Sequence, residues 1–538
     1  MISLVVFTVD NGTTLALAFD PPRSKLSDGS FLFTRSEIEK VINKMKDKSA
    51  TGPDNISTRF LKSFSAFIAV PLELIFNKTL RQGILPTIWK HADVTPIYKG
   101  KGKRSERSNY RPISLTCICC KISERLVKDH IVQFLASNSV LSTFQHGFMQ
   151  NRSTESQLLV SVNDWCSMLE CGMYVDVVYL DISKAFDSVC HAKLLQKLSF
   201  LGIDGAILSF IENFLCNRSQ RVKVGLEVSS TSSVTSGVPQ GSVLGPLLFL
   251  CYINDVVNVL QDSSIQIFAD DSKIYIGSRD PNDSRLAHDV SRVLEWSNHN
   301  QLKLSLEKCT AMHLGSRNPR NQIHINNFCL PVESVTRDLG VFVSDDLKFS
   351  VHCQKIVCKA LIKSNLIFKS FLCRDRKFLV SMFKTYVRCL LESNTCVWSP
   401  YLLGDISKVE SVQRKFTKRV PGLRTVSYQA RLEALKLETL ELRRLKFDLT
   451  QVFKILNGFV DVDKAKFFDL STNCTRGHSQ KLFLPRCSLN VSKFSFKFRV
   501  VEPWNYLPDS VVTAPSVAVF KSRLKNVNLE RFLKYDFN

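Results

Sequence analysis

The residues with the clearest chemical potential are two adjacent aspartates, Asp270 and Asp271, in the middle of residues 265–276. Apolar side chains alternate on both sides of the pair, a pattern that predicts a β-hairpin with the acids at its tip. Adjacent carboxylates repel each other, and a shared divalent cation relieves that repulsion. Hard oxygen ligands suit Mg²⁺. The spacing therefore predicts a metal site at a turn, although an isolated Asp-Asp pair is more often an ordinary turn.

A third carboxylate, Asp181, follows the β-branched run 175–180. This run predicts a strand with Asp181 at its carboxyl end, and residues 183–189 are expected to open a helix directly after it. Taken alone, an acid in this place caps a helix roughly half the time. Together with the acidic hairpin, it supplies the third carboxylate that a two-metal site requires.

Cations and glycines surround these acids in the sequence. Residues 99–104 carry four cations among glycines, which suits a mobile loop that closes on phosphates and equally suits a solvated surface loop. Arg111, next to Pro112, can pair with a triphosphate through two hydrogen bonds. The Gly/Pro-rich turn 236–246 leads into an apolar helix predicted over 247–259. Its glycines would let the backbone approach a flat ligand closely.

Size and charge narrow the class of partner. A chain of 538 residues is expected to form roughly two to four domains. The formal net charge of +23 indicates an acidic polymer or an anionic membrane as partner, and nucleic acid is preferred. Most of the excess lies in residues 341–538, which hold 35 Lys and Arg against 17 Asp and Glu.

The sequence also indicates a compartment. No apolar run has membrane-spanning length, and the short apolar start, residues 2–8, lacks the basic residues that precede a signal peptide core. The 17 cysteines are scattered and are expected to be reduced, mostly buried thiols. These features predict a soluble intracellular protein.

Helical and extended patterns alternate before the acids. Thr34 and Ser36 cap a helix predicted over 36–46, and a second helix is predicted from about Arg59 to Gln82. Residues 94–98 read as a strand. Further helices are expected from about Cys120 to Ala136 and from about Arg152 to Leu169.

Taken together, three motifs resemble the palm of non-LTR (LINE-type) retrotransposon reverse transcriptases: residues 180–187, 237–246 and 268–271. Weaker matches are similar to the fingers, to neighbouring palm motifs and to the primer-grip turn. These are residues 109–115, 145–154, 296–308 and 338–341. The tail resembles the thumb and C-terminal region of jockey-like elements, at residues 386–388, 397–401, 413–419, 441–444 and 504–508.

The resemblance implies an α+β fold of the right-hand polymerase type. An antiparallel palm sheet would carry Asp181 and the Asp270-Asp271 hairpin, beside helical fingers and a helical thumb starting near Val351. The domains expected are a helical N-terminal extension (1–90), fingers and palm (91–345), thumb (346–460) and a basic C-terminal region (461–538).

The implied activity is that of an RNA-directed DNA polymerase, which extends a DNA primer on an RNA template by two-metal-ion nucleotidyl transfer. The implied cofactor is a pair of Mg²⁺ ions, with Mn²⁺ as a substitute. Asp181, Asp270 and Asp271 are the expected catalytic residues. The same three carboxylates and the backbone carbonyl of Ile182 are the expected metal ligands.

Two further sets of residues carry expected contacts. The nucleotide contacts are Lys99, Arg111, Phe186, Gln240 and Lys308. Phe186 matches the position that excludes a ribose 2′-hydroxyl, with core packing as the alternative, and Lys303 competes with Lys308 as a proton donor to pyrophosphate. The expected nucleic-acid contacts are Arg152, Arg414, Lys415, Lys418 and Arg419.

The expected partners are an RNA template, a DNA primer and deoxynucleoside triphosphates, with no membrane. An endonuclease or RNA-binding protein from the same element is a candidate partner, because the residues before Thr34 are too few for the endonuclease domain usual in this clade. A ribonucleoprotein of nucleus and cytoplasm is the expected setting. The alternatives are a decayed or co-opted copy that binds nucleic acid without catalysis and, more weakly, a group II intron-like maturase.

Overall fold

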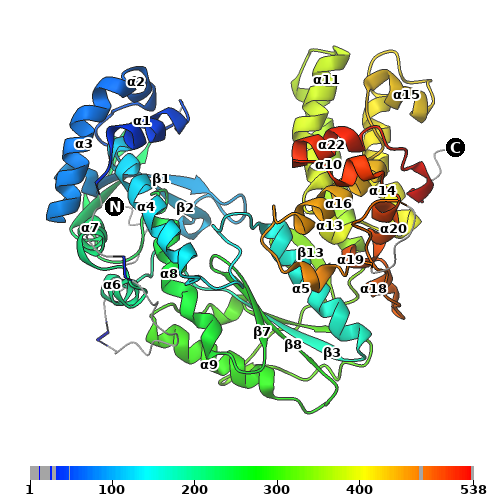
Figure 1. Ribbon diagram of the computed structural model, residues 1–538, viewed down its shortest axis with the longest axis horizontal. Coiled ribbons are helices and arrows are strands. Elements are labelled where there is room, and N and C mark those ends of the chain that lie inside the picture. Colours follow the sequence, from blue (N-terminus) through cyan, green and yellow to red (C-terminus); the bar gives the residue numbers. More distant parts are fainter. Residues whose placement is uncertain (1–10, 13–24, 27–31, 48, 472–476, 535–538) are drawn as a thin grey trace.

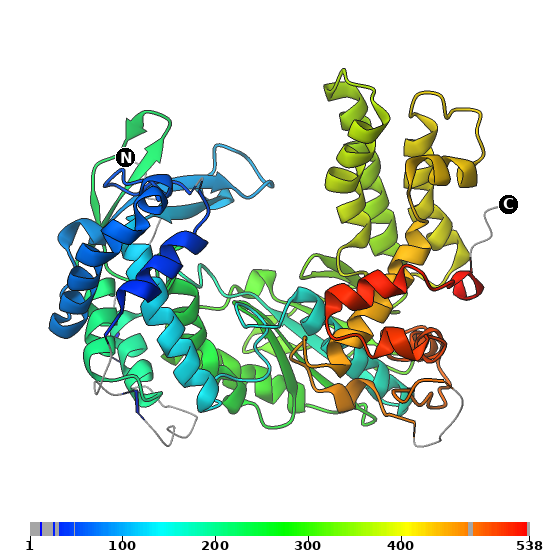
Figure 2. The same ribbon diagram turned by 45° about the horizontal axis from the view of Figure 1, so that its top comes forward.

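The computed structural model describes residues 11–12, 25–26, 32–47, 49–471 and 477–534, which form an open hand (Figure 1). Helices and antiparallel strand pairs are both present, so the predicted α+β class is confirmed. A palm sheet lies at the base, between the half that holds the fingers and the half that holds the thumb (Figure 2). The apolar start, residues 2–8, lies outside the described residues. No helix in the described part of the chain has the length and apolar character needed to cross a bilayer.

The first N-terminal helix begins after Thr34, as predicted. The Thr34 side chain accepts a hydrogen bond from the Glu37 N–H, and the Glu37 carboxylate accepts one from the Thr34 N–H, which forms a capping box. The single helix predicted from Arg59 to Gln82 is instead two helices, because the chain leaves helical geometry at Phe64. The elements are α1 (Arg35–Lys44), α2 (Thr58–Ser63), α3 (Ser65–Gln82) and the 3₁₀ turn η1 (Thr87–Lys90).

The fingers are not purely helical, contrary to expectation. They contain a five-stranded sheet in which β1 pairs antiparallel with β2 and parallel with β4. The strand predicted at residues 94–98 is confirmed as part of β1. The elements are β1 (His91–Tyr98), η2 (Arg107–Asn109), β2 (Tyr110–Leu115), α4 (Ile118–Ser137), α6 (His191–Phe200), α7 (Gly205–Leu215), β4 (Arg218–Val224), β5 (Glu227–Val228) and β6 (Ser232–Val234).

The palm is a four-stranded antiparallel sheet in the order β7-β8-β3-β9. Its strands are β3 (Tyr174–Leu180), β7 (Ser264–Phe268), β8 (Asp271–Ser278) and β9 (Thr310–Leu314). The sheet separates two hydrophobic cores. Val178 and Ile274 belong to the core shared with the fingers, whereas Val177 and Tyr275 belong to the core shared with the thumb. Alternation along the strands therefore fixes both halves of the molecule to one sheet.

Helices and small hairpins complete the palm. The predicted apolar helix 247–259 is α8 followed by a 3₁₀ segment, η3. The remaining elements are α5 (Thr154–Glu170), α8 (Gly245–Ile253), η3 (Asn254–Val259), α9 (Arg285–His299), η4 (Leu306–Lys308), β10 (His324–Ile325), β11 (Phe328–Cys329), β12 (Val335–Asp338) and β13 (Val341–Ser344).

The thumb is helical from Ser350 onward, and the C-terminal region packs into the same core. Trp398 of the thumb and Trp504 of the tail are both fully buried in it. The thumb comprises α10 (Ser350–Ser370), α11 (Arg376–Met382), the π-helical turn η5 (Phe383–Arg388), α12 (Cys389–Glu392), α13 (Thr395–Trp398), α14 (Leu403–Lys418), α15 (Tyr428–Leu435) and α16 (Leu440–Leu456). The tail comprises α17 (Lys464–Phe467), α18 (Asn490–Lys493), α19 (Phe496–Arg499), α20 (Val501–Asn505), α21 (Asp509–Val512), α22 (Val517–Leu524) and η6 (Glu530–Phe532). All described cysteines are free thiols.

Candidate active site

The acidic hairpin forms as predicted. Phe268 pairs with Asp271, so Ala269 and Asp270 are the two residues of the turn, and Ala269 has a left-handed φ of +58°. The turn is fixed by Gln145, whose side-chain oxygen accepts hydrogen bonds from the Ala269 N–H (2.9 Å) and the Gly147 N–H (2.7 Å). A Cβ on Gly147 would lie 2.3 Å from the Ala269 nitrogen. Glycine is therefore required where this segment meets the hairpin.

Asp181 lies at the carboxyl end of β3, as predicted, on the strand next to the acidic hairpin. The register pairs Leu180 with Ser272, which brings Asp181 alongside Asp271. The Asp181 carbonyl accepts the Ser305 N–H (2.8 Å), and the Ser183 N–H donates to the Lys303 carbonyl (2.9 Å), so the segment after β3 is bound to the segment before β9. Antiparallel pairing thus gathers three acids that lie far apart in the sequence.

The carboxylates lie close enough to alter one another's ionisation. Burial raises the pKa of Asp270, and the charge of Asp181 raises it further, whereas Arg111 lowers it. The Asp271 side chain is exposed to solvent at the hairpin, but nearby protein atoms partly desolvate its carboxylate. Desolvation and then the charges of Asp270 and Asp338 raise the pKa of Asp271 to about 6. A divalent cation would relieve this crowding of negative charge, so the oxygen donors fit such an ion.

Lys308 lies directly against one of the three acids. Lys308 Nζ is 3.0 Å from Asp181 Oδ2, and both side chains are partly exposed. Within the part of the chain that the structure describes, no three His, Cys, Asp or Glu side chains form a metal-ligand cluster by themselves. The Asp181 carboxylate, which lies near Asp270, is therefore paired with the ammonium group of Lys308.

The predicted triphosphate contacts converge on the same place. Arg111 is exposed on β2, and its charge reaches Asp270. Burial lowers the pKa of Lys99, and the charges of Arg111 and Lys308 lower it further. These three cations therefore lie close enough for their charges to interact, near the acids. Such a cluster is costly unless an anion binds it.

The Gly/Pro-rich turn, residues 236–246, packs against residues 186–189, which follow Asp181. Gln240 Nε2 donates to Asp187 Oδ1 (2.9 Å), and the Gln240 carbonyl accepts the Ser114 N–H (2.7 Å). A Cβ on Gly237, where φ is +84°, would lie 2.8 Å from the Asp187 Cα. The predicted helix over 183–189 is wrong. Lys184 has a left-handed φ of +47° and these residues form turns, which allows this close approach before α6.

Phe186 packs against other aromatic rings, as the core-packing alternative predicts. Its ring stacks on Phe249 at 4.6 Å between centroids, and Phe148 lies edge-on to it at 6.2 Å. It is nevertheless only half-buried. Packing on Phe249 thus fixes the orientation of a ring whose other part remains accessible.

The predicted nucleic-acid contacts differ in accessibility. The Arg152 side chain is only 7% exposed, and its guanidinium pairs with Asp461 and donates to the carbonyls of Thr143 and Gln145. Arg152 therefore joins the loop before α5 to the tail. Arg414 is half-buried against Tyr428. Lys415, Lys418 and Arg419 are exposed at the end of α14.

Two buried groups that position the site were not singled out from the sequence. The Glu124 carboxylate accepts hydrogen bonds from the N–H groups of Val243 (2.7 Å) and Leu244 (3.0 Å), which anchors the Gly/Pro-rich turn. Lys273 forms a buried ion pair with Asp338. The available signals were a glutamate on the apolar face of a helix and a lysine inside an apolar strand.

Comparisons with known proteins agree with this geometry. The family described as reverse transcriptase (RNA-dependent DNA polymerase) matches residues 97–349, which include all three acids. The probable RNA-directed DNA polymerase from transposon X-element of Drosophila melanogaster is 26% identical over 72% of this chain. The RNA-directed DNA polymerase from mobile element jockey of the same organism is 27% identical over 72% of the chain. In both cases the match covers 44% of the relative, so the chain spans less than half the length of these relatives.

Proposed function

Since residues 97–349 are a reverse transcriptase domain related to those of non-LTR retrotransposons, we propose that this chain is an RNA-directed DNA polymerase. It would extend a DNA primer on an RNA template with deoxynucleoside triphosphates. The observation that carries the proposal is the convergence of Asp181 with the Asp270-Asp271 hairpin, opposite the cations Lys99 and Arg111. Acids beside a cluster of cations suit a triphosphate with its metal ions.

A reverse transcriptase domain implies a divalent metal requirement, and we propose two Mg²⁺ ions, with Mn²⁺ as a substitute. Asp181 and Asp270 would hold both ions, with the Ile182 carbonyl as a further ligand and Asp271 at the periphery. When bound, such ions make a primer 3′-hydroxyl nucleophilic and stabilise the pyrophosphate charge. The closeness of the Asp181, Asp270 and Asp271 charges supports this assignment.

The chain's own side chains would then orient the nucleotide. Lys99 and Arg111 would neutralise the triphosphate. The half-buried ring of Phe186 would lie under the sugar and exclude a 2′-hydroxyl, and its stacking on Phe249 supports that fixed position. Gln240, held by Asp187, would contact the base pair that is being formed. Lys308 is the candidate proton donor to pyrophosphate once it leaves Asp181.

We propose that the domains divide at the predicted boundaries, with an N-terminal extension (1–90), fingers and palm (91–345), thumb (346–460) and C-terminal region (461–538). The match to residues 97–349 supports the second of these. The thumb and the tail would hold template and primer through phosphate contacts, as the net charge of +23 favours. An endonuclease or RNA-binding protein of the same element is a candidate partner, and a ribonucleoprotein of nucleus and cytoplasm is the proposed setting.

Primer extension tests the function directly. The full chain with Mg²⁺, an RNA template, a labelled DNA primer and deoxynucleotides should extend the primer. Asp270→Asn should reduce the rate at least about 10³-fold, because a neutral amide cannot take the place of a metal-binding carboxylate. Asp280→Asn, at an exposed aspartate beyond the end of β8, is the matched control and should leave the rate unchanged.

Equal extension by wild type and Asp270→Asn would show that the acids are misassigned. Tight binding of RNA by a folded sample that extends no primer would instead favour the second candidate, a decayed or co-opted copy that binds nucleic acid without catalysis.

A further inference from the structure

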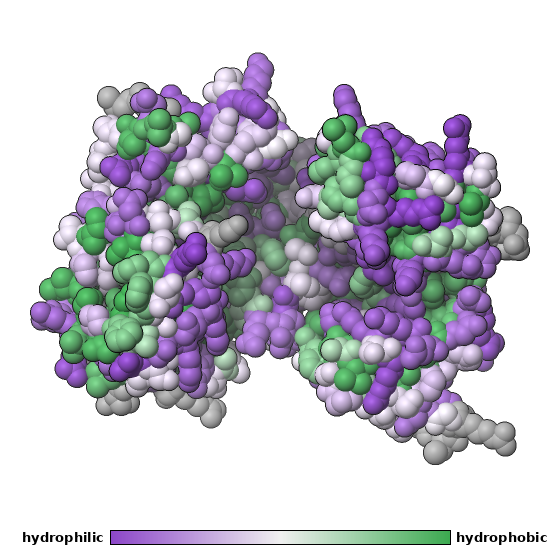
Figure 3. Space-filling view, turned by 90° about the horizontal axis from the view of Figure 1, so that it is seen from above, coloured by the Kyte–Doolittle hydropathy of each residue, from purple (hydrophilic) through white to green (hydrophobic). Residues whose placement is uncertain are grey.

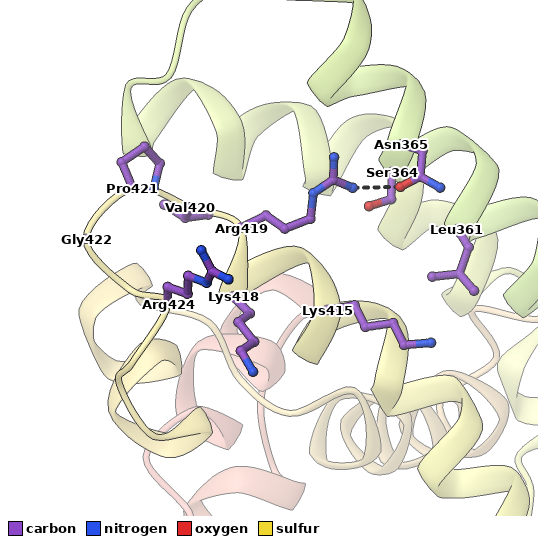
Figure 4. A pocket seen from close by; sticks show the side chains of 10 residues that line it. All are labelled: Leu361, Ser364, Asn365, Lys415, Lys418, Arg419, Val420, Pro421, Gly422 and Arg424. Carbon is purple, nitrogen blue, oxygen red and sulfur yellow. Dashed lines mark hydrogen bonds between the residues drawn. The ribbon is translucent and has the colours of Figure 1, made fainter.

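Arg218, the first residue of β4, is a buried cation in the fingers and is only 3% exposed. Cations elsewhere in the chain lie at the surface. Hydrophilic side chains cover much of the thumb half seen from above (Figure 3), and Lys415, Lys418 and Arg424 beside the thumb cavity are exposed (Figure 4). Burying a guanidinium is costly unless hydrogen bonds or opposite charges compensate for its desolvation. The surroundings of Arg218 should therefore show what this cation does.

The direct contacts of the Arg218 side chain satisfy only part of its guanidinium. Nη1 donates to the Phe214 carbonyl at the end of α7 (2.9 Å), and Cζ lies 4.8 Å from the centroid of the Phe214 ring. Nη2 is buried and has no hydrogen-bond partner among the residues that the structure describes. The contacts with Phe214 thus leave part of the desolvation cost of the cation without compensation.

The opposite charge nearby belongs to Glu124 of α4, which is fully buried. One oxygen of its carboxylate accepts the N–H groups of Val243 (2.7 Å) and Leu244 (3.0 Å), and the other faces the Cys120 thiol at 3.6 Å. Burial raises the pKa of Glu124, whereas the Leu244 N–H and then the charge of Arg218 lower it. Arg218 therefore favours the charged form of the carboxylate that holds the Gly/Pro-rich turn.

The two charged residues act on opposite ends of this turn. Arg218 pairs with Val234 in the β4–β6 ladder, and β6 leads directly into the start of the turn. Glu124 binds the backbone near the other end of the turn, and Gln240 lies between the two. Hydrogen bonds to a charged carboxylate are roughly twice as strong as those to a neutral group. A loss of the Glu124 charge would therefore loosen the segment that carries Gln240.

We propose that Arg218 is a positioning residue, whose buried charge keeps the Glu124 carboxylate ionised and thereby holds the Gly/Pro-rich turn and Gln240 in place. This deepens the proposed polymerase function, and its kinetic consequence rests on that function. A simpler explanation is that Arg218 only closes the end of α7 through Phe214. In that case its loss would destabilise the fingers without loosening the turn in particular.

Amide hydrogen exchange of the full chain tests the proposal without any need for catalysis. Mass spectrometry of peptides that cover residues 236–246 follows the turn. Arg218→Met should speed exchange there about tenfold, and α7 should change less. Arg218→Lys keeps the charge and should stay close to wild type. Arg221→Met is the matched control, because Arg221 lies on the same strand but is 44% exposed and pairs with Asp93. It should leave exchange at the turn unchanged.

A double variant separates action through Glu124 from an independent effect. Glu124→Gln should also speed exchange over residues 236–246. Addition of Arg218→Met to Glu124→Gln should have little further effect, because a neutral amide needs no counter-charge. A further tenfold acceleration in the double variant would show that Arg218 acts independently and would overturn the proposal. The same comparison provides the test if Arg218→Met alone does not fold, since the double variant buries no unpaired acid.

Primer extension measures the consequence for the reaction. Arg218→Met should raise the KM for deoxynucleotides about fivefold and keep kcat within about twofold, because Gln240 is proposed to contact the base pair and not the reacting atoms. Arg218→Lys should restore the KM. Unchanged exchange at the turn, equal acceleration by Arg221→Met, or no rescue by Arg218→Lys would overturn the proposal. If Asp270→Asn extends the primer as well as wild type, the polymerase assignment fails, and the exchange results still decide the role of Arg218.

Discussion

The buried ammonium group of Lys273 forms an ion pair with Asp338, and this pair joins the acidic hairpin to the β12–β13 hairpin. The two side chains are 1% and 7% exposed. Lys273 lies two residues after Asp271, and Asp338 ends the strand before the turn Leu339-Gly340. The hairpin that resembles a primer grip is thereby tied to the strand that begins with Asp271.

Lys273→Met should destabilise the protein by roughly 3 kcal/mol, because the Asp338 carboxylate then stays buried without its partner. The free energy of unfolding, measured in urea, checks this. Lys273→Met/Asp338→Leu should recover part of the loss, since both charges are gone. Lys25→Met breaks an exposed pair with Asp204 and should cost less than about 1 kcal/mol. A loss no larger than that of the control would contradict the buried pair.

Lys308→Met should strengthen Mn²⁺ binding to the chain without nucleotide by roughly two- to fivefold. The ammonium group lies 3.0 Å from Asp181 and competes with a cation for that carboxylate, in a pair too exposed to be strong. Titration followed by electron paramagnetic resonance measures free Mn²⁺. Lys303→Met is the control, because Lys303 is exposed nearby but forms no ion pair among the described residues. The same affinity in both variants would argue against competition at Asp181.

Gly237→Ala should raise the KM for deoxynucleotides and lower the Tm, because its Cβ would press on the backbone of Asp187 at 2.8 Å. Asp187 holds Gln240, so the displacement would reach the residue that we propose contacts the base pair. Gly225→Ala is the matched control. Its φ of +64° is also left-handed, but no atom lies within 4 Å of the added Cβ. It should cost about 1 kcal/mol and leave KM unchanged. If the KM rose in both variants, backbone strain alone would explain the effect, and the contact with Asp187 would not be needed.

Acid should destabilise the junction of palm and thumb through His352, which is 3% exposed. Its Nδ1 accepts the Phe342 N–H (3.2 Å), and burial, followed by the charge of Lys359, lowers the pKa of His352 to about 4. Between the ordinary pKa of 6.5 and about 4, the unfolded chain binds a proton that the folded chain does not. Stability therefore falls as the pH falls through this window, by up to about 3 kcal/mol.

His352→Gln keeps an acceptor but cannot titrate, so it should flatten the dependence of the free energy of unfolding on pH between 6.5 and 4. His288→Gln, at an exposed histidine, should leave the wild-type slope. The free energy of unfolding at each pH, from urea denaturation, provides the comparison. Parallel slopes for wild type and His352→Gln would exclude this contribution.

The local patterns of the sequence determined where the acids lie on their elements. Alternation on both sides of Asp270 predicted the hairpin, the β-branched run predicted the strand before Asp181, and Thr34 predicted the start of a helix, because each depends on near neighbours in the chain. The helix predicted after Asp181 failed for the complementary reason. The turns over 183–189 pack against Gly237 of a distant segment, whose N–H donates to the Val189 carbonyl, and local periodicity carries no information about such a partner.

Only the tertiary structure decided which groups hold these elements together. Three contacts join residues far apart in sequence. Gln145 binds the backbone of the acidic hairpin, Glu124 binds the backbone of the Gly/Pro-rich turn, and Asp338 pairs with Lys273. A polar side chain in an apolar segment indicates burial with a partner, but many partners satisfy that need equally. The fold selects one by bringing two distant segments within hydrogen-bonding distance, and that proximity is a property of packing.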